Sequence, residues 1–124
     1  MASEQVRVLI ADDQRLFAEA LEAILSTDGR IKVVARAADG GGAVGLAREH
    51  HPDVILMDIA MPVLDGFAAT ERIREEVPEA RVIILSGSDA TQDISRARAV
   101  GAAGYVTKDQ IAGDLVQAIL DTGS

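Results

Sequence analysis

The stretch 53–66 constrains the fold more than any other part of this 124-residue chain. Its first part, Val54–Met57, is an unbroken apolar run between two aspartates, which is typical of a strand buried on both faces. Asp58 ends this strand, and a loop is expected next because Pro62 disfavours helical backbone at the residue before it. Asp65-Gly66 then favours a turn and a capped helix start. We therefore expect Asp58 to be presented, rather than buried, at the carboxyl end of a central strand.

An apolar strand followed by a helix of mixed polarity recurs five times along the chain. The predicted strands are Val6–Ala11, Ile31–Ala37, Val54–Met57, Val82–Leu85 and Gly104–Thr107. The predicted helices follow them, with apolar positions from Phe17 to Leu25, then over Gly40–His50, Phe67–Glu76, Ala90–Val100 and Ile111–Ile119. Short connections between alternating strands and helices imply a parallel sheet with helices on both faces, and every strand then ends at the same edge. We expect one α/β domain over residues 1–124.

The composition excludes several classes of function. A formal net charge of −8 at pH 7 would repel a nucleic-acid backbone, so direct nucleic-acid binding by this chain is not expected. No apolar run approaches the roughly 18 residues of a membrane-spanning helix, and the amino terminus lacks the pattern of a secretion signal. The absence of cysteine excludes disulfides and thiolate metal sites, and it makes the cytoplasm the expected compartment.

Polar side chains gather at the edge of the sheet where the predicted strands end. They are Asp12 and Asp13 after the first strand, Asp58 after the third, Ser86 and Ser88 after the fourth, and Lys108 after the fifth. Crowded carboxylates disfavour one another's ionisation unless a cation compensates, and Mg²⁺ prefers oxygen ligands that it shares with a phosphate. We therefore expect Asp58 to be a nucleophile that accepts a phosphoryl group, with Lys108 and Ser86 contacting the new oxygens.

These residues and their spacing resemble the receiver domains of two-component response regulators. The resemblance rests on Asp12-Asp13, on the pattern Asp58-x-x-Met61-Pro62-x-x-Asp65-Gly66, on Ser86 and on Tyr105-x-x-Lys108, and it spans nearly the whole chain. It implies a CheY-like, flavodoxin-like (βα)5 fold with strand order 2-1-3-4-5. The segment 101–109 is most similar to the NarL/FixJ class, in which a helix-turn-helix DNA-binding domain follows the receiver. This implies transcription regulation through an output domain outside this chain, although a single-domain receiver stays an open alternative.

The resemblance also implies how the acidic cluster works. Asp58 would take a phosphoryl group from a phosphohistidine of a sensor histidine kinase. Mg²⁺ would be held by Asp13, Asp58 and the backbone carbonyl of Ala60, with Asp12 assisting. The chain would then be a phosphoacceptor with slow self-catalysed phosphorylation and dephosphorylation, and not an enzyme.

A second group of residues matches the positions that carry the signal in this family. Ser86 and Tyr105 match the switch pair, so that movement of the serine would let the tyrosine turn inward and alter the face around the fifth strand. A homodimer through that face is one expected assembly. Ala60 and Ser88 match the two positions that flank the approach of the hydrolytic water. Both are small, and we expect a short-lived phosphoryl group.

Other interpretations of the same residues stay open. Gly40–Gly45 matches the G-x-G-x-x-G pattern of nucleotide-binding α/β enzymes, although Asp39 places an anion where the pyrophosphate would lie. A phosphatase that uses Asp58 would need a second acid two residues on, where Ala60 stands. A stand-alone interaction module that is never phosphorylated would share the fold but leave the acidic cluster unexplained. The adjacent pair His50-His51 is expected at a helix carboxyl end rather than in a metal site.

Overall fold

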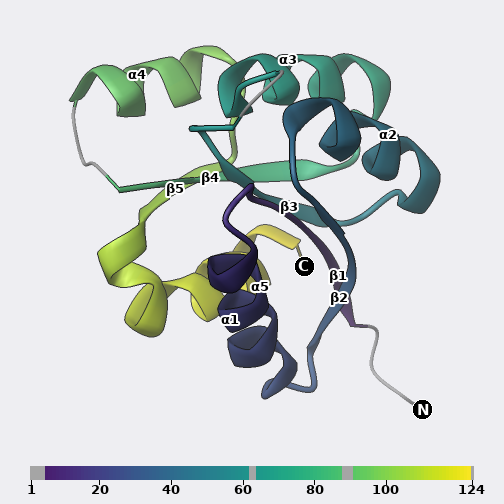
Figure 1. Cartoon of the computed structure of the whole chain (residues 1–124), viewed down its shortest axis with the longest axis vertical. Coiled ribbons are helices and arrows are strands. Elements are labelled where there is room, and N and C mark those ends of the chain that lie inside the picture. Colours follow the sequence, from purple (N-terminus) through teal and green to yellow (C-terminus); the bar gives the residue numbers. More distant parts are fainter. Residues whose placement is uncertain (1–4, 62–63, 88–90, 124) are drawn as a thin grey trace.

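Five parallel strands form the centre of the fold, in the order β2-β1-β3-β4-β5 (Figure 1). The computed structural model describes residues 5–61, 64–87 and 91–123. The strands are β1 (Val6–Ala11), β2 (Ile31–Ala37), β3 (Val54–Asp58), β4 (Arg81–Ser86) and β5 (Gly104–Thr107). This order and the parallel pairing confirm the flavodoxin-like (βα)5 fold that the sequence resemblance implies.

Helices cover both faces of the sheet, with α2, α3 and α4 on one face and α1 and α5 on the other (Figure 1). Their bounds are α1 (Arg15–Ser26), α2 (Gly40–His50), α3 (Gly66–Glu76), α4 (Thr91–Ala99) and α5 (Val116–Gly123). Among the residues that the structure describes, no helix is both long enough and apolar enough to cross a membrane. Most boundaries agree with the predicted ones to within a residue, but the predicted start of the fourth helix, Ala90, lies outside the described residues.

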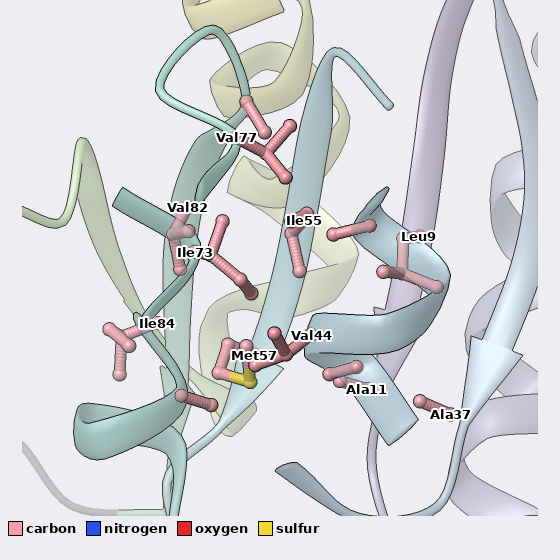
Figure 2. Close-up of a cluster of buried hydrophobic side chains, with 14 of the residues drawn as sticks. Leu9, Ala11, Ala37, Val44, Ile55, Met57, Ile73, Val77, Val82 and Ile84 are labelled. Carbon is pink, nitrogen blue, oxygen red and sulfur yellow. The ribbon is translucent and has the colours of Figure 1, made fainter. Parts of the chain in front are cut away.

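Two apolar cores, one on each face, hold β3 in the middle of the molecule. Leu9, Ile55 and Met57 belong to the core under α2 and α3 (Figure 2). Val8 and Leu56 belong to the core on the side of α1 and α5, and all five side chains are fully buried. Because successive side chains on a strand point to opposite faces, a shift of one residue in β3 would exchange the two cores. The packing therefore fixes where β3 ends, and with it the position of Asp58.

The amino end of α2 explains the first of its glycines, Gly40. The side chain of Asp39 accepts a hydrogen bond from the backbone N–H of Gly42 at 2.7 Å and caps the helix. A Cβ atom on Gly40 would collide with the backbone carbonyl of Leu64, so only glycine permits this close approach. The carboxylate of Asp39 thus occupies the helix terminus that a pyrophosphate would need, which counts against the nucleotide-binding interpretation.

The end of the chain departs from the single continuous helix expected over 111–119. One 3-10 turn spans Lys108–Gln110, a π-helical segment spans Ile111–Leu115, and the α-helical part begins only at Val116. The hydroxyl of Thr107 donates to the carboxylate of Asp109 at 2.5 Å, and such local side-chain bonds compete with helical backbone bonds. This turn sets the direction in which Lys108 leaves β5.

Candidate functional site

Three carboxylates meet at the carboxyl edge of the sheet, as predicted. Asp12 and Asp13 directly follow β1, and Asp58 is the last residue of β3. The two strands are paired, with Ala11 opposite Met57, so the residues that follow are neighbours. One oxygen of each carboxylate lies within 4.8 Å of the other two. Such a set of hard oxygen donors is the kind that Mg²⁺ prefers.

Asp58 is buried, with 4% of its surface exposed, so the expectation of an exposed carboxylate is wrong. It lines an open cleft of about 330 Å³ together with Asp13, Ser86 and Lys108. Burial raises the pKa of the Asp58 carboxyl, and the negative charge of Asp12 raises it further. The charge of Lys108 and the backbone N–H of Ala60 oppose this increase in pKa only in part. The site therefore holds a carboxylate whose charge is incompletely compensated.

Lys108 supplies the positive charge nearest to that carboxylate. Its Nζ lies 3.5 Å from Oδ1 of Asp58 and 3.5 Å from Oδ2 of Asp12. The Phe17 ring is a further neighbour of this amine, with its centroid 4.4 Å from Nζ. Because β4 stands between β3 and β5, the Lys108 side chain crosses the end of β4 to reach Asp58.

Asp12 provides a test of whether a cation fits the cluster. Its Oδ1 accepts the backbone N–H of Gln14 at 2.8 Å, whereas its Oδ2 is buried and has no hydrogen-bond partner among the described residues. A buried carboxylate oxygen without such a partner is costly. A divalent ion bound between Asp12, Asp13 and Asp58 would remove this cost and the mutual repulsion, so the donor set fits Mg²⁺.

The loop between β3 and α3 holds Asp58 in place. Asp65 caps α3 by accepting the backbone N–H of Ala68 at 2.9 Å, and the N–H of Gly66 donates to the carbonyl of Ile59 at 3.2 Å. A Cβ atom on Gly66 would collide with the carbonyl oxygen of Asp58. The Asp-Gly pair is therefore needed to bring the helix start against the end of β3.

The remaining predicted site residues fall in different places. Ser86 ends β4, is 1% exposed and lines the same cleft as Asp58, with Ala60 at the exposed rim. Tyr105 is half-buried in β5 and lines a separate cleft of about 160 Å³ between α4 and β5. Ser88 lies outside the described residues.

Several residues at the site were not predicted from the sequence. Asp93 of α4 and Gly87 line the cleft above Asp58, and Gln14 binds Asp12 through its backbone. The sequence pattern places Phe17 only on the apolar face of the first helix, and its contact with Lys108 has no signal in the local sequence. His51 is hydrogen-bonded through Nδ1 to Oε1 of Glu79 at 2.8 Å, far from the acidic cleft.

The parallel sheet is covered by helices on both faces, two acidic residues follow its first strand, a third ends its third strand, and a lysine follows its fifth. This combination defines a class of signalling domain. The family model described as the response regulator receiver domain matches residues 8–120. The chain belongs to this family. Its members are the receiver domains of two-component response regulators.

The chain is similar to regulators of the NarL type. It is 38% identical over 118 residues to the transcriptional regulatory protein NarL of Mycobacterium tuberculosis, covering 95% of this chain and 55% of the relative. The solved receiver domain of NarL from that organism matches with a TM-score of 0.91 and 38% identity, over 96% of each chain.

A second solved structure, the CheX–CheY–BeF₃–Mg²⁺ complex of Borrelia burgdorferi, matches with a TM-score of 0.88 and 28% identity, over 95% of this chain and 89% of that chain. The chain spans about half the length of the curated relatives that it matches first. These comparisons confirm the predicted resemblance to NarL-type receivers.

Proposed function

We propose that this chain is the cytoplasmic phosphoacceptor of a two-component system, in which a sensor histidine kinase transfers a phosphoryl group to Asp58. The observation that carries the proposal is the setting of Asp58, which is buried beside Asp12 and within 3.5 Å of the Lys108 amine. A DNA-binding output domain outside this chain would convert the modification into transcription regulation, and the similar NarL of Mycobacterium tuberculosis is named as a transcriptional regulatory protein.

The chemistry follows from the side chains at the cleft. An oxygen of Asp58 attacks phosphorus, an O–P bond forms, and the P–N bond of the phosphohistidine breaks with its electron pair returning to the imidazole. The Lys108 amine contacts the new phosphoryl oxygens, because it already lies 3.5 Å from Asp58 before transfer. Asp12, Asp13, Asp58 and the carbonyl of Ala60 would hold Mg²⁺, which when bound neutralises phosphoryl oxygens. The similar CheY of Borrelia burgdorferi, solved in complex with BeF₃ and Mg²⁺, supports this assignment.

Ser86 and Tyr105 would carry the signal away from the cleft. Ser86 pairs with Thr107 and Ile84 pairs with Tyr105 across adjacent strands, so a movement at the end of β4 reaches β5 directly. The cleft beside Tyr105 is bounded by α4, in which Ala97 is the one buried residue among those described. A helix with so little buried surface can change position at low cost. The face around β5 is therefore the proposed output surface and the proposed homodimer interface.

Intact-mass measurement after incubation with phosphoramidate and Mg²⁺ tests the phosphoacceptor. The wild-type chain should gain one phosphoryl group, Asp58→Asn should gain none, and chelation of Mg²⁺ should abolish the gain. Asp53→Asn is the matched control, because Asp53 lies at the opposite end of the same strand, where it accepts the backbone N–H of Arg7. Labelling of Asp58→Asn, or a wild-type chain that is never labelled, would overturn the proposal in favour of an interaction module without phosphate.

Fluorescence of Tyr105 tests the switch, since the chain has one tyrosine and no tryptophan. The wild-type emission should change on phosphorylation. Ser86→Ala should still accept the phosphoryl group, because the hydroxyl does not attack phosphorus, but its Tyr105 emission should stay unchanged. A normal emission change in Ser86→Ala would show that the hydroxyl does not couple the two sites.

A further inference from the structure

The amine of Lys108 is held by three groups that come from three different parts of the chain. Two are the carboxylates of Asp12 and Asp58, each 3.5 Å away. The third is the ring of Phe17, in the first turns of α1, whose centroid lies 4.4 Å from Nζ. This distance is well within the range of about 6 Å over which a cation is attracted to the face of an aromatic ring.

The two ion-pair distances show that neither carboxylate holds the amine closely. A charge-assisted N–H···O bond is usually about 2.7 to 2.9 Å long, so 3.5 Å leaves both contacts loose. A lysine side chain has many rotamers, and two loose contacts restrict it weakly. The ring of Phe17 adds a third restraint, because its face attracts the ammonium group in addition to the two carboxylates.

Phe17 could also be explained as an ordinary core residue. It is half-buried and packs against the apolar core on the side of α1 and α5. Leucine would fill most of the same space, but it has no aromatic face and cannot attract an ammonium group. A comparison of leucine with tyrosine at this position therefore separates apolar packing from the aromatic contact.

We propose that Phe17 is a positioning residue that holds the Lys108 amine over the acidic cleft, ready to meet a phosphoryl oxygen on Asp58. This inference rests on the proposed phosphoacceptor function of Asp58. It assigns α1 a direct part in preparing the cleft, through a contact between segments near opposite ends of the chain. The lysine is then placed before phosphate arrives, so less ordering is required during transfer.

NMR spectroscopy of the lysine side chains tests this contact, and the spectrum is simple because the chain has two lysines, Lys32 and Lys108. Labelling with lysine enriched in ¹³C at the ε carbon should give two signals, which Lys32→Arg assigns. In the metal-free wild-type protein the ε protons of Lys108 should be shifted upfield by the ring current of Phe17, whereas those of Lys32, which is exposed on β2, should not. The upfield shift should vanish in Phe17→Leu and persist in Phe17→Tyr.

The same variants should differ in the rate of phosphorylation by phosphoramidate in the presence of Mg²⁺. Phe17→Leu should be slower by about threefold to fivefold, which is the size expected for one partly exposed cation–π contact, and Phe17→Tyr should recover most of the rate. Phe67→Leu is the matched control, since it removes the other phenylalanine, whose ring lies 4.5 Å from the Arg96 guanidinium and away from Lys108. Its rate should equal that of the wild type. Phe17→Met replaces Phe17→Leu if the latter does not fold.

The outcomes separate this inference from the proposed function. A wild-type chain that is never phosphorylated refutes the phosphoacceptor, and the Lys108 signal still reports whether the ring and the amine are in contact. A Lys108 signal without an upfield shift, or equal phosphorylation rates in the wild type, Phe17→Leu and Phe17→Tyr, overturns the positioning role. An equal loss of rate in the leucine and tyrosine variants also overturns it, because the aromatic face would then not matter.

Discussion

Replacing Asp58 by asparagine should make the folded protein more stable, although the change removes the proposed reactive group. One Asp58 oxygen lies within 4.8 Å of oxygens from Asp12 and Asp13, and each repulsion is worth about 3.5 kcal/mol at an effective dielectric constant of about 20. The attraction to Lys108 across 3.5 Å is worth about 4.7 kcal/mol on the same scale. The two repulsions exceed the attraction by roughly 2 kcal/mol. Because Asp13 is exposed and solvent screens it, we expect a gain in stability of about 1 to 2 kcal/mol.

Urea unfolding at pH 7 with a chelator present measures this gain. With a slope of about 2 kcal/mol per molar urea, the midpoint for Asp58→Asn should rise by roughly 0.5 to 1 M. Glu49→Gln, which removes a negative charge from the exposed side of α2, is the control and should shift the midpoint little.

The gain should depend on pH and on Mg²⁺. The pKa of the Asp58 carboxyl is raised in the folded protein, so the folded state keeps this proton at a pH where the unfolded state has lost it. The wild type therefore loses stability as the pH rises from the ordinary pKa of 3.8 through the raised pKa. Above that range, the difference in unfolding free energy between Asp58→Asn and the wild type reaches its full size. Saturating Mg²⁺ should narrow the gap, because the wild type offers the ion one more carboxylate. The reasoning is refuted if Asp58→Asn is less stable than the wild type, or if the difference in unfolding free energy between them depends on neither pH nor Mg²⁺.

Three further changes test other parts of the structure. Ala60→Met should lengthen the lifetime of the phosphoryl group, because a longer side chain at the exposed rim of the cleft obstructs water. A tenfold longer lifetime corresponds to an increase of about 1.4 kcal/mol in the barrier to hydrolysis. Equal decay times of the two phosphorylated proteins under the same Mg²⁺ would show that Ala60 does not control the access of water. Gly66→Ala should lower the free energy of unfolding by about 2 kcal/mol or more, since the added Cβ would meet the Asp58 carbonyl. Gly45→Ala is the control, because nothing lies within 4 Å of its added Cβ, and it should raise the free energy of unfolding by up to about 1 kcal/mol. Urea unfolding measures both changes. His51→Ala should raise the pKa of the Glu79 carboxyl toward its ordinary value of 4.5, because in the wild type the hydrogen bond with His51 lowers this pKa. A ¹³C NMR titration in which the pKa of Glu79 does not change would contradict this contact.

The strands and the acidic cluster could be predicted because both depend on local patterns. Val54–Met57 has no polar side, so it must be buried on both faces, and the side chains after parallel strands must share one edge. The order of the strands had a different origin. The apolar runs do not show which strands are neighbours, and the order 2-1-3-4-5 comes from the resemblance to receiver domains, which the structure confirms.

The features that escaped prediction all depend on contacts between distant residues. Asp58 is buried beside Asp12, which follows β1, and Lys108, which follows β5, and nothing in the stretch 53–66 encodes these neighbours. The contact of Phe17 with Lys108 has the same origin. In the last helix, the predicted apolar positions Ile111 and Ile119 are buried as expected, but the polar turn before them diverts the backbone into 3-10 and π geometry.

The place of Lys108 on the last strand has a consequence for how the protein folds. The pair β1 and β3 assembles three carboxylates, and their countercharge is added only when β5 has docked beyond β4. A partly folded chain that has β1 and β3 in place but lacks β5 concentrates negative charge without relief, so such an intermediate is disfavoured. The strand order thus couples the first and second halves of the chain into one cooperative folding transition. Divalent cations in solution should accelerate refolding, because they can neutralise the three carboxylates before Lys108 is in place.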